Sequence, residues 1–178
     1  MPITTPAQQQ LQRLVRVVPN FPKPGIDFRD ITPLLGSPAE FAMAVVAMIT
    51  PWRDANITHV IGIESRGFIF GAPVALGLSA SFVPLRKPGK LPRTVLREAY
   101  ALEYGTDALE MHSDALQPGA RVLIIDDVLA TGGTAMAAAR LVQHAASVVA
   151  GFGFFIEIEA LEARRQLPAV RVEATLAY

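Results

Sequence analysis

The segment VLIIDDVLATGGTA, residues 122–135, decides the fold of this chain. It begins as an uninterrupted apolar run, which predicts a buried strand over residues 121–126, and it continues into a helix predicted over residues 133–144. Two adjacent carboxylates, Asp126 and Asp127, stand at the end of that strand. A buried strand followed by a short loop and a helix is typical of a parallel sheet that helices cover on both faces.

The loop between this strand and helix is built from small residues, namely Ala130, Thr131, Gly132, Gly133, Thr134 and Ala135. Small side chains let backbone N–H groups approach a phosphate closely, and the amino terminus of the helix adds partial positive charge. The Gly-Lys-Ser/Thr ending of nucleoside triphosphatase loops is absent. The acidic pair is suited to accept hydrogen bonds from vicinal hydroxyls. A phosphate and a diol together describe ribose 5-phosphate, although a strand end followed by a tight turn would leave a similar pattern.

Short apolar runs alternate with alanine-rich segments along the rest of the chain. Helices are expected over residues 8–17, from residue 38, and over 66–78 and 160–166, and strands over 59–63, 81–84, 147–158 and 170–176. Residues 19–33 and 85–106 are expected to be irregular, with a candidate strand at 109–112. This order predicts a single α/β domain over the whole chain, whose ligands bind beyond the carboxyl ends of the strands.

The composition of the chain narrows the functions that it can have. Sixteen basic and sixteen acidic residues cancel, so no overall field would gather nucleic acid or a membrane surface. The absence of cysteine excludes disulfides, thiolate metal sites and a cysteine nucleophile. The polar amino terminus does not resemble a secretory signal, and a cytoplasmic location is expected. Glycine and proline interrupt the uncharged stretch over residues 67–85, which predicts a buried helix and strand there instead of a membrane span.

Four segments together carry a resemblance to a known family. Residues 122–135 resemble the 5-phosphoribosyl 1-pyrophosphate signature of type I phosphoribosyltransferases. Three further segments follow the order and spacing of adenine phosphoribosyltransferases: FPKPGIDFRDITPL (residues 21–34), GIESRGFIF (62–70) and PLRKPGKLPRTVLREAYALEYG (84–105). The resemblance implies an α/β fold, in which a parallel twisted sheet has helices on both faces, plus a small amino-terminal hood (about residues 1–35) and a mobile lid loop (about residues 85–106).

The same resemblance implies a reaction and its participants. Adenine and 5-phosphoribosyl 1-pyrophosphate would give AMP and pyrophosphate, as in purine salvage. Mg²⁺ would be carried by the pyrophosphate, without direct protein ligands, and the protein would form a homodimer. No nucleic-acid or membrane partner is expected.

Site residues are assigned by matching this sequence to the motifs of the family. The phosphoribosyl group would be held by Asp126, Asp127, Ala130, Thr131, Gly132, Gly133, Thr134 and Ala135. The pyrophosphate would be held by Ser65, Arg66, Arg86, Lys87, Lys90 and Tyr104. The base would be held by Asp27, Phe28, Arg29 and Ile158. Glu103 would be the catalytic acid or base, because burial could raise the pKa of a glutamate close to the purine toward neutrality.

Each of these residues also has a purely structural interpretation. Ser65 could cap a helix while Arg66 points into solvent, and the charges of residues 85–106 could be simply solvated. Phe28 could anchor its loop on the core. Arg93 and Arg97 match no role required in the family, and the three histidines, His59, His112 and His144, lack metal-ligand spacing.

Two other functions remain open at this point. The enzyme could act on a 6-oxopurine such as hypoxanthine or xanthine. Alternatively, the chain could be a regulator that binds the ribosyl donor without catalysis, although the length leaves no room for an additional DNA-binding domain.

Overall fold

The computed structural model describes residues 5–101 and 106–178. The chain forms two compact units, Met1–Ala47 and Met48–Tyr178. Each unit is described separately below.

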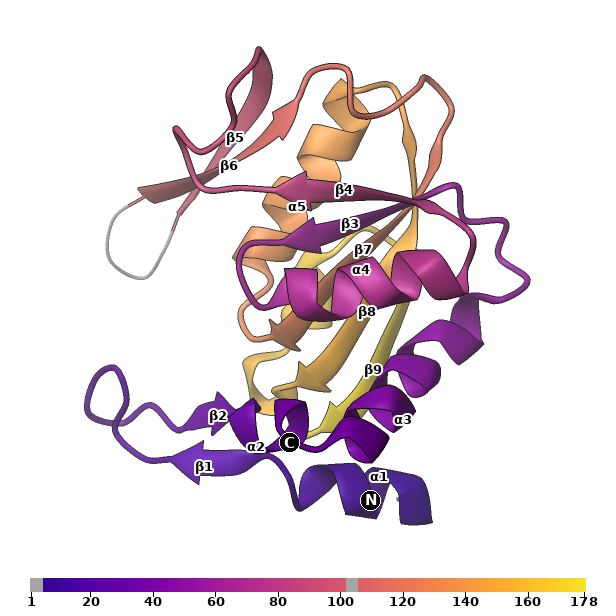
Figure 1. Ribbon diagram of the computed structural model, residues 1–178. Helices are drawn as coiled ribbons and strands as arrows, with labels where there is room; N and C mark the ends of the chain where they lie inside the picture. Colours follow the sequence, from indigo (N-terminus) through magenta and orange to yellow (C-terminus); the bar gives the residue numbers. More distant parts are fainter. Residues whose placement is uncertain (1–4, 102–105) are drawn as a thin grey trace. The chain divides into compact units, whose positions relative to one another are not determined.

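The second unit is built around a five-stranded parallel sheet with the strand order β4-β3-β7-β8-β9. The strands are β3 (His59–Ile63), β4 (Ser81–Leu85), β7 (Arg121–Leu129), β8 (Val148–Glu157) and β9 (Arg171–Ala177). Helix α4 (Gly67–Gly77) connects β3 to β4, and α5 (Gly133–His144) connects β7 to β8 in the opposite direction across the sheet. Right-handed crossovers in opposite directions place the two helices on opposite faces (Figure 1). The predicted α/β architecture is confirmed.

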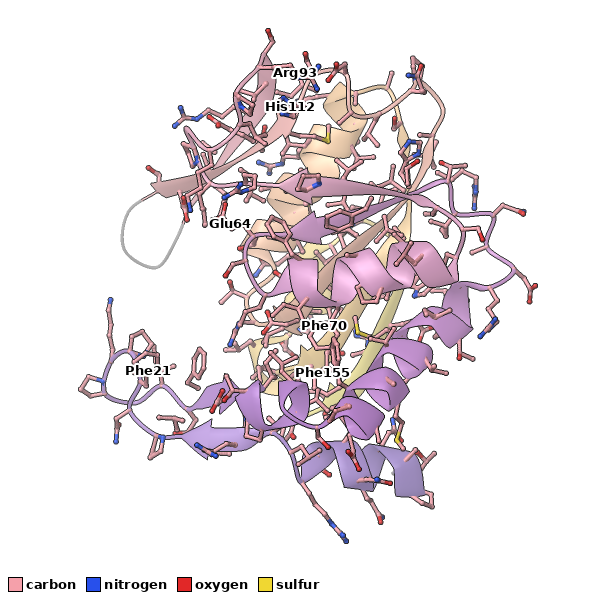
Figure 2. The ribbon with its side chains drawn as sticks, in the orientation of Figure 1. Phe21, Glu64, Phe70, Arg93, His112 and Phe155 are labelled. Carbon is pink, nitrogen blue, oxygen red and sulfur yellow. The ribbon has the colours of Figure 1, made fainter. Side chains whose placement is uncertain are left out.

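Close backbone contacts fix α4 on its face of the sheet. A Cβ added to Gly71 of α4 would lie 3.1 Å from the Cα of Gly62 in β3, and 2.9 Å from the Phe82 ring. Phe70 of α4 stacks on Phe155 of β8, with ring centroids 5.2 Å apart (Figure 2). The uncharged stretch over residues 67–85 is therefore a helix followed by a strand, as predicted, although Leu76 of the helix and Phe82 of the strand are exposed. Within the described part of the chain, no helix is both long and apolar enough to cross a membrane.

A two-stranded antiparallel hairpin lies beside this sheet, and it corrects the expectation of an irregular segment over residues 85–106. The hairpin consists of β5 (Val95–Ala101) and β6 (Thr106–His112), so the candidate strand at 109–112 is real and longer than expected. Arg86 and Glu110 exchange two backbone hydrogen bonds of 2.9 and 2.8 Å. These bonds join the end of β4 to the hairpin, which also packs along α5.

The first unit contains a small hairpin and short helices. Its elements are α1 (Pro6–Gln12), β1 (Arg16–Val18), β2 (Phe28–Asp30), α2 (Thr32–Leu35) and most of α3 (Pro38–Ile49), which continues into the second unit. The helix expected over residues 8–17 instead covers Pro6–Gln12, and Arg16 and Val17 lie in β1. The stretch 19–33, expected to be irregular, contains β2 and the start of α2. Phe21 and Phe28 meet edge to face, with ring centroids 5.2 Å apart.

Three short 3₁₀ turns complete the chain. They are η1 (Thr50–Trp52), η2 (Glu159–Leu161) and η3 (Ala163–Gln166). The helix expected over residues 160–166 is therefore two separate turns. They are joined at Glu162, which has a φ of +48°.

Candidate active site

The topology places two loops side by side at one edge of the sheet. Strands β3 and β7 are neighbours, and the connections that leave them run in opposite directions. Ligands of open α/β sheets bind at such a switch point, beyond the carboxyl ends of the strands. The loops that follow these two strands contain Ser65 with Arg66, and residues 130–132. Both of these segments were predicted as binding segments.

A pocket lies over the end of β7 and the start of α5. Its lining is Asp126, Val128, Leu129, Ala130, Thr131, Gly132, Thr134, Ala135 and Phe154. Gly132 caps α5 with a φ of +88°, a left-handed conformation that favours glycine. The loop therefore presents backbone groups and the amino terminus of a 12-residue helix to the pocket. Of the residues predicted to hold the phosphoribosyl group, the pocket collects all but Asp127 and Gly133.

The two carboxylates of the acidic pair have different surroundings. β7 continues past them to Leu129, so they do not end the strand as expected. Asp126 lines the pocket and lies against α4, because a Cβ added to Gly67 would come 2.8 Å from Asp126 Oδ1. Asp127 is 4% exposed and forms an ion pair of 2.8 Å with Arg66 Nε. Arg66 is therefore not a free cation in solvent.

Both carboxyl groups have raised pKa values. Burial raises the pKa of Asp126 well above its usual value, and the neighbouring Asp127 carboxylate adds to the effect. Burial also raises the pKa of Asp127, against the opposing effect of Arg66. Because burial disfavours the charged form of these two carboxyl groups, hydroxyl groups that donate hydrogen bonds to them would stabilise that charge. Raised pKa values of this kind are typical of functional sites.

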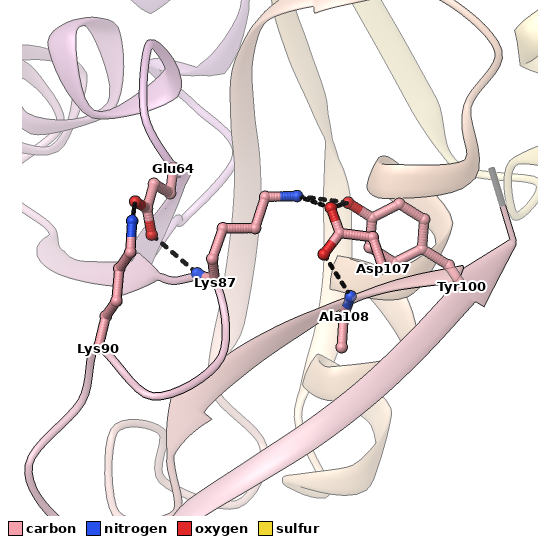
Figure 3. A network of polar contacts seen from close by, with 6 residues as sticks. All are labelled: Glu64, Lys87, Lys90, Tyr100, Asp107 and Ala108. Carbon is pink, nitrogen blue, oxygen red and sulfur yellow. Dashed lines mark hydrogen bonds and ion pairs between the residues drawn. The ribbon is translucent and has the colours of Figure 1, made fainter. Parts of the chain in front are cut away.

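Glu64, at the end of β3, gathers the basic residues that follow β4. Its Oε2 accepts a hydrogen bond of 3.1 Å from Arg86 Nε. The same oxygen accepts one of 2.8 Å from the Lys87 backbone N–H, and Oε1 pairs with Lys90 Nζ (Figure 3). Burial alone would raise the pKa of Glu64, but the hydrogen bonds from Lys90, Lys87 and Arg86 lower it to about 2. The carboxylate is therefore a fixed negative charge among these basic groups.

Lys87 is held by a second acidic residue, from the hairpin. Its Nζ forms an ion pair with Asp107 and donates a hydrogen bond of 2.9 Å to Tyr100 Oη (Figure 3). The Ala108 backbone N–H donates to the other Asp107 oxygen at 2.7 Å. Burial disfavours the charged forms of both Lys87 and Asp107. The ion pair between the two side chains nevertheless raises the pKa of Lys87 and lowers that of Asp107.

Ser65 does not have the capping role that was its alternative interpretation. The capping residue of α4 is Arg66, and no side chain caps the helix. Ser65 is exposed and lies in the loop that follows β3.

Ile158 follows β8, and its backbone N–H donates a hydrogen bond of 3.0 Å to the Leu129 carbonyl. Leu129 directly precedes residues 130–135, the predicted phosphate loop. The other residues predicted to bind the base, Asp27, Phe28 and Arg29, lie in and just before β2 of the first unit. Glu103 and Tyr104 lie outside the described residues.

Sequence reasoning gave no role to Glu64, Tyr100 or Asp107. A signal existed for Glu64, which precedes Ser65 directly at the end of a predicted strand. Asp107 had none, because its contact with Lys87 spans 20 residues and depends on a hairpin that had been interpreted as a loop.

No group of three or more His, Asp or Glu residues in the described ranges 5–101 and 106–178 could hold a metal ion. Mg²⁺ is commonly bound through one or two carboxylates together with the phosphates of a substrate. The carboxylate of Asp126 lines the pocket, so the residues present fit an Mg²⁺ ion that is also bound to phosphate oxygens.

An open parallel sheet with a loop of small residues at its switch point, and with a basic segment after the neighbouring strand β4, is the arrangement expected of one class of protein: the phosphoribosyltransferases. In agreement, residues 41–173 match the phosphoribosyl transferase domain family. The chain is 51% identical over 168 residues to the adenine phosphoribosyltransferase of Myxococcus xanthus (strain DK1622), which covers 94% of this chain and 91% of that protein. The chain belongs to the adenine phosphoribosyltransferase family.

Solved structures of two relatives lead to the same assignment. The crystal structure of adenine phosphoribosyltransferase from Rhodothermus marinus superposes with a TM-score of 0.92 at 53% identity, over 97% of this chain and 98% of that chain. The enzyme from Saccharomyces cerevisiae, complexed with an imino-altritol bisphosphate and adenine, superposes with a TM-score of 0.90 at 36% identity, over 96% and 98%.

Proposed function

We propose that this protein transfers the 5-phosphoribosyl group of 5-phosphoribosyl 1-pyrophosphate to N9 of adenine, giving AMP and pyrophosphate. The observation that supports this most directly is the pocket of residues 126–135 beside the loop of Ser65 and Arg66, at one edge of the sheet. The yeast relative, whose crystal contains adenine together with a bisphosphate, supports adenine as the base. The 6-oxopurine and regulator alternatives are not favoured.

The phosphoribosyl group would occupy the pocket. Backbone N–H groups of residues 130–135, with the hydroxyls of Thr131 and Thr134, would bind the 5′-phosphate. The carboxylate of Asp126, which lines the pocket, would accept hydrogen bonds from the ribose hydroxyls. Asp127 would contribute by holding Arg66 in place.

The pyrophosphate would lie between Ser65 with Arg66 and the basic segment that follows β4. Arg86, Lys87 and Lys90 bring positive charge to this side, and we assign Tyr104 to it from the motif match alone. Mg²⁺, when bound to the pyrophosphate oxygens, would neutralise part of the charge that develops on the leaving group.

The reaction breaks the bond between C1′ and a pyrophosphate oxygen and forms the bond between C1′ and N9 of the purine. Electrons of the broken bond stay with the pyrophosphate, and the purine loses the proton of its ring. We assign management of that proton to Glu103, and contacts with the base to Asp27, Phe28, Arg29 and Ile158. A homodimer and a cytoplasmic location are also part of the proposal, on the basis of family membership.

The assignment of Glu103 makes a specific prediction. Glu103→Gln keeps the size of the side chain but removes its ability to take up a proton, so kcat should fall by about 100-fold or more, with a much smaller rise in the KM for adenine. Steady-state kinetics would measure both values. The matched control is Glu98→Gln in β5, where Glu98 pairs with Arg140 of α5; its kcat should stay close to that of the wild type. An unchanged kcat in Glu103→Gln would remove Glu103 from the mechanism.

Pyrophosphate release by the purified protein tests the proposed function as a whole. The assay would supply the ribosyl donor and Mg²⁺ with adenine, hypoxanthine or guanine in separate reactions. Release with adenine alone supports the proposal. Release with hypoxanthine or guanine in preference would indicate a 6-oxopurine enzyme, and donor binding without release would indicate a regulator.

A further inference from the structure

The phosphate loop has a close neighbour in the carboxyl-terminal part of the chain. A Cβ added to Gly132 would come 3.2 Å from the Ala163 carbonyl oxygen and 3.4 Å from Ala163 Cβ. Ala163 is 1% exposed. The loop therefore rests on Ala163, and in a close-packed interior a shift of Ala163 would shift the loop.

Ala163 depends on other residues for its position. It begins η3, a short 3₁₀ turn, and such turns are stabilised poorly by their own hydrogen bonds. The next residue, Arg164, donates from Nε to Glu157 Oε1 (2.7 Å), from Nη2 to Glu157 Oε2 (2.6 Å) and from Nη1 to the Val172 carbonyl (2.9 Å). The guanidinium thus ties η3 to both β8 and β9.

Glu157 connects this ion pair to the other end of the loop. It is the last residue of β8, is 6% exposed, and pairs in the sheet with Leu129, which directly precedes Ala130. The hydrogen bonds to Glu157 raise the pKa of Arg164, so the guanidinium remains charged. The pair therefore supports the loop at its start, through Leu129, and at its middle, through Ala163.

We propose that Arg164 and Glu157 are positioning residues for the 5′-phosphate of the ribosyl donor. By holding Ala163 against Gly132, they keep the backbone N–H groups of the loop in the geometry that a phosphate needs. The bidentate geometry requires arginine, because lysine cannot donate two parallel hydrogen bonds to one carboxylate. This inference rests on the assignment of the phosphate loop in the proposed function.

Calorimetric titration of the full-length protein with ribose 5-phosphate, without adenine, tests the inference. Arg164→Ala should raise the Kd about tenfold and raise the KM for the donor. Its kcat at saturating donor should stay within about twofold, because a binding contribution common to ground and transition states affects KM alone. Arg164→Lys should give an intermediate loss. The control is Arg165→Ala, since Arg165 is 76% exposed and pairs only with exposed Glu162 among the contacts described; its Kd should not change.

If Arg164→Ala does not fold, Glu157→Gln decides, since it keeps the size of the side chain and should raise the Kd about fivefold. A folded Arg164→Ala protein with a Kd within twofold of the wild type would overturn the inference. A fall in kcat and Tm at unchanged Kd would overturn it as well. A wild type that binds ribose 5-phosphate but makes no AMP would refute the proposed function, while loss of binding in Arg164→Ala would still support the inference.

Discussion

The phosphate loop, residues 130–135, offers backbone groups and a helix amino terminus to the ligand that we propose for it, whereas the segment after β4 offers basic side chains that carboxylates already hold. Among the described residues that line the phosphate pocket, Asp126 is the one charged side chain. On the other side, Glu64 binds Arg86, Lys87 and Lys90, and Asp107 binds Lys87 as well. The first region is ready to accept an anion. In the second, an anion has to compete with acidic residues.

This difference suits the two groups that the regions are proposed to bind. The 5′-phosphate stays attached to substrate and product alike, so a rigid site serves both. The pyrophosphate has to leave, and basic groups that return to Glu64 and Asp107 can release it. The variants below alter one region at a time, from the largest expected effect to the smallest.

Gly132→Ala should have the largest effect, because it disturbs the preformed loop. The left-handed φ costs a side chain about 1–2 kcal/mol, and the new Cβ would also press on the Ala163 carbonyl at 3.2 Å. The KM for the donor should rise about 30-fold, as measured by steady-state kinetics.

Gly119→Ala is the matched control for this variant. Gly119 has a similar φ of +78°, but a Cβ there would meet nothing within 4 Å. It should lower the Tm without changing the KM. An equal rise in KM in both variants would contradict the special role of the loop.

Asp126→Asn should weaken donor binding about tenfold, because a charge-assisted hydrogen bond to the ribose becomes a neutral one. It should also stabilise the protein. The pKa of Asp126 is raised in the folded state, so the folded protein binds more protons than the unfolded chain above about pH 4. The stability of the wild type therefore falls as the pH rises above about 4 toward the raised pKa of Asp126. The variant has no carboxyl group at this position, so its stability does not fall for this reason.

Thermal melts of the wild type and Asp126→Asn across the pH range measure this difference. The Tm of the variant should exceed that of the wild type at pH 7.5, and the gap should close toward about pH 4. If the variant is less stable than the wild type at every pH, the charge of Asp126 does not destabilise the folded protein.

Glu64→Gln should have the opposite combination of effects. It removes the charge that competes for Arg86 and Lys90, so pyrophosphate should bind about fivefold more tightly at low salt, and less so at high salt. The protein should become less stable. With a pKa of about 2, Glu64 contributes stability above its unfolded pKa of about 4.3, and this contribution is lost as the pH falls toward 2.

Calorimetry with pyrophosphate and Mg²⁺ would measure the change in affinity, and melts between pH 2 and 7 would measure the change in stability. Weaker binding of pyrophosphate to Glu64→Gln would mean that Glu64 arranges the basic segment instead of competing for it.

Arg93→Ala should have the smallest effect on the KM for the donor, less than about twofold. Arg93 pairs with Asp114, and both side chains are more than 60% exposed. It lies near His112, away from Glu64 (Figure 2). A large rise in KM for this variant would mean that the pyrophosphate-binding region reaches the end of the hairpin where Arg93 lies.

The sheet and the phosphate loop could be predicted from the sequence because their signals are local. Strand β3 and helix α5 have the bounds that apolar runs and glycine predict, since buried parallel strands are apolar throughout. Strand β5 was not predicted, because the glycine and prolines of residues 85–94 led the whole segment 85–106 to be interpreted as a loop. Hairpin β1–β2 was hidden by the prolines between its strands.

Much of the detail of the candidate site depends on contacts between distant residues. Glu64 meets Lys90 across 26 residues, and Gly132 meets Ala163, which follows it beyond α5, β8 and η2. Sequence spacing gives no information about such contacts, although it did identify the motifs in which Glu64 and Gly132 stand.

The most direct test of the whole account is a competition for the donor. The purified protein would receive 5-phosphoribosyl 1-pyrophosphate and Mg²⁺ with equal concentrations of adenine, hypoxanthine and guanine, and the nucleotides formed would be separated and quantified. The account predicts AMP in amounts equal to the pyrophosphate released, with IMP and GMP near background. Nucleotide formed mainly from hypoxanthine or guanine, or none from any base, would contradict it.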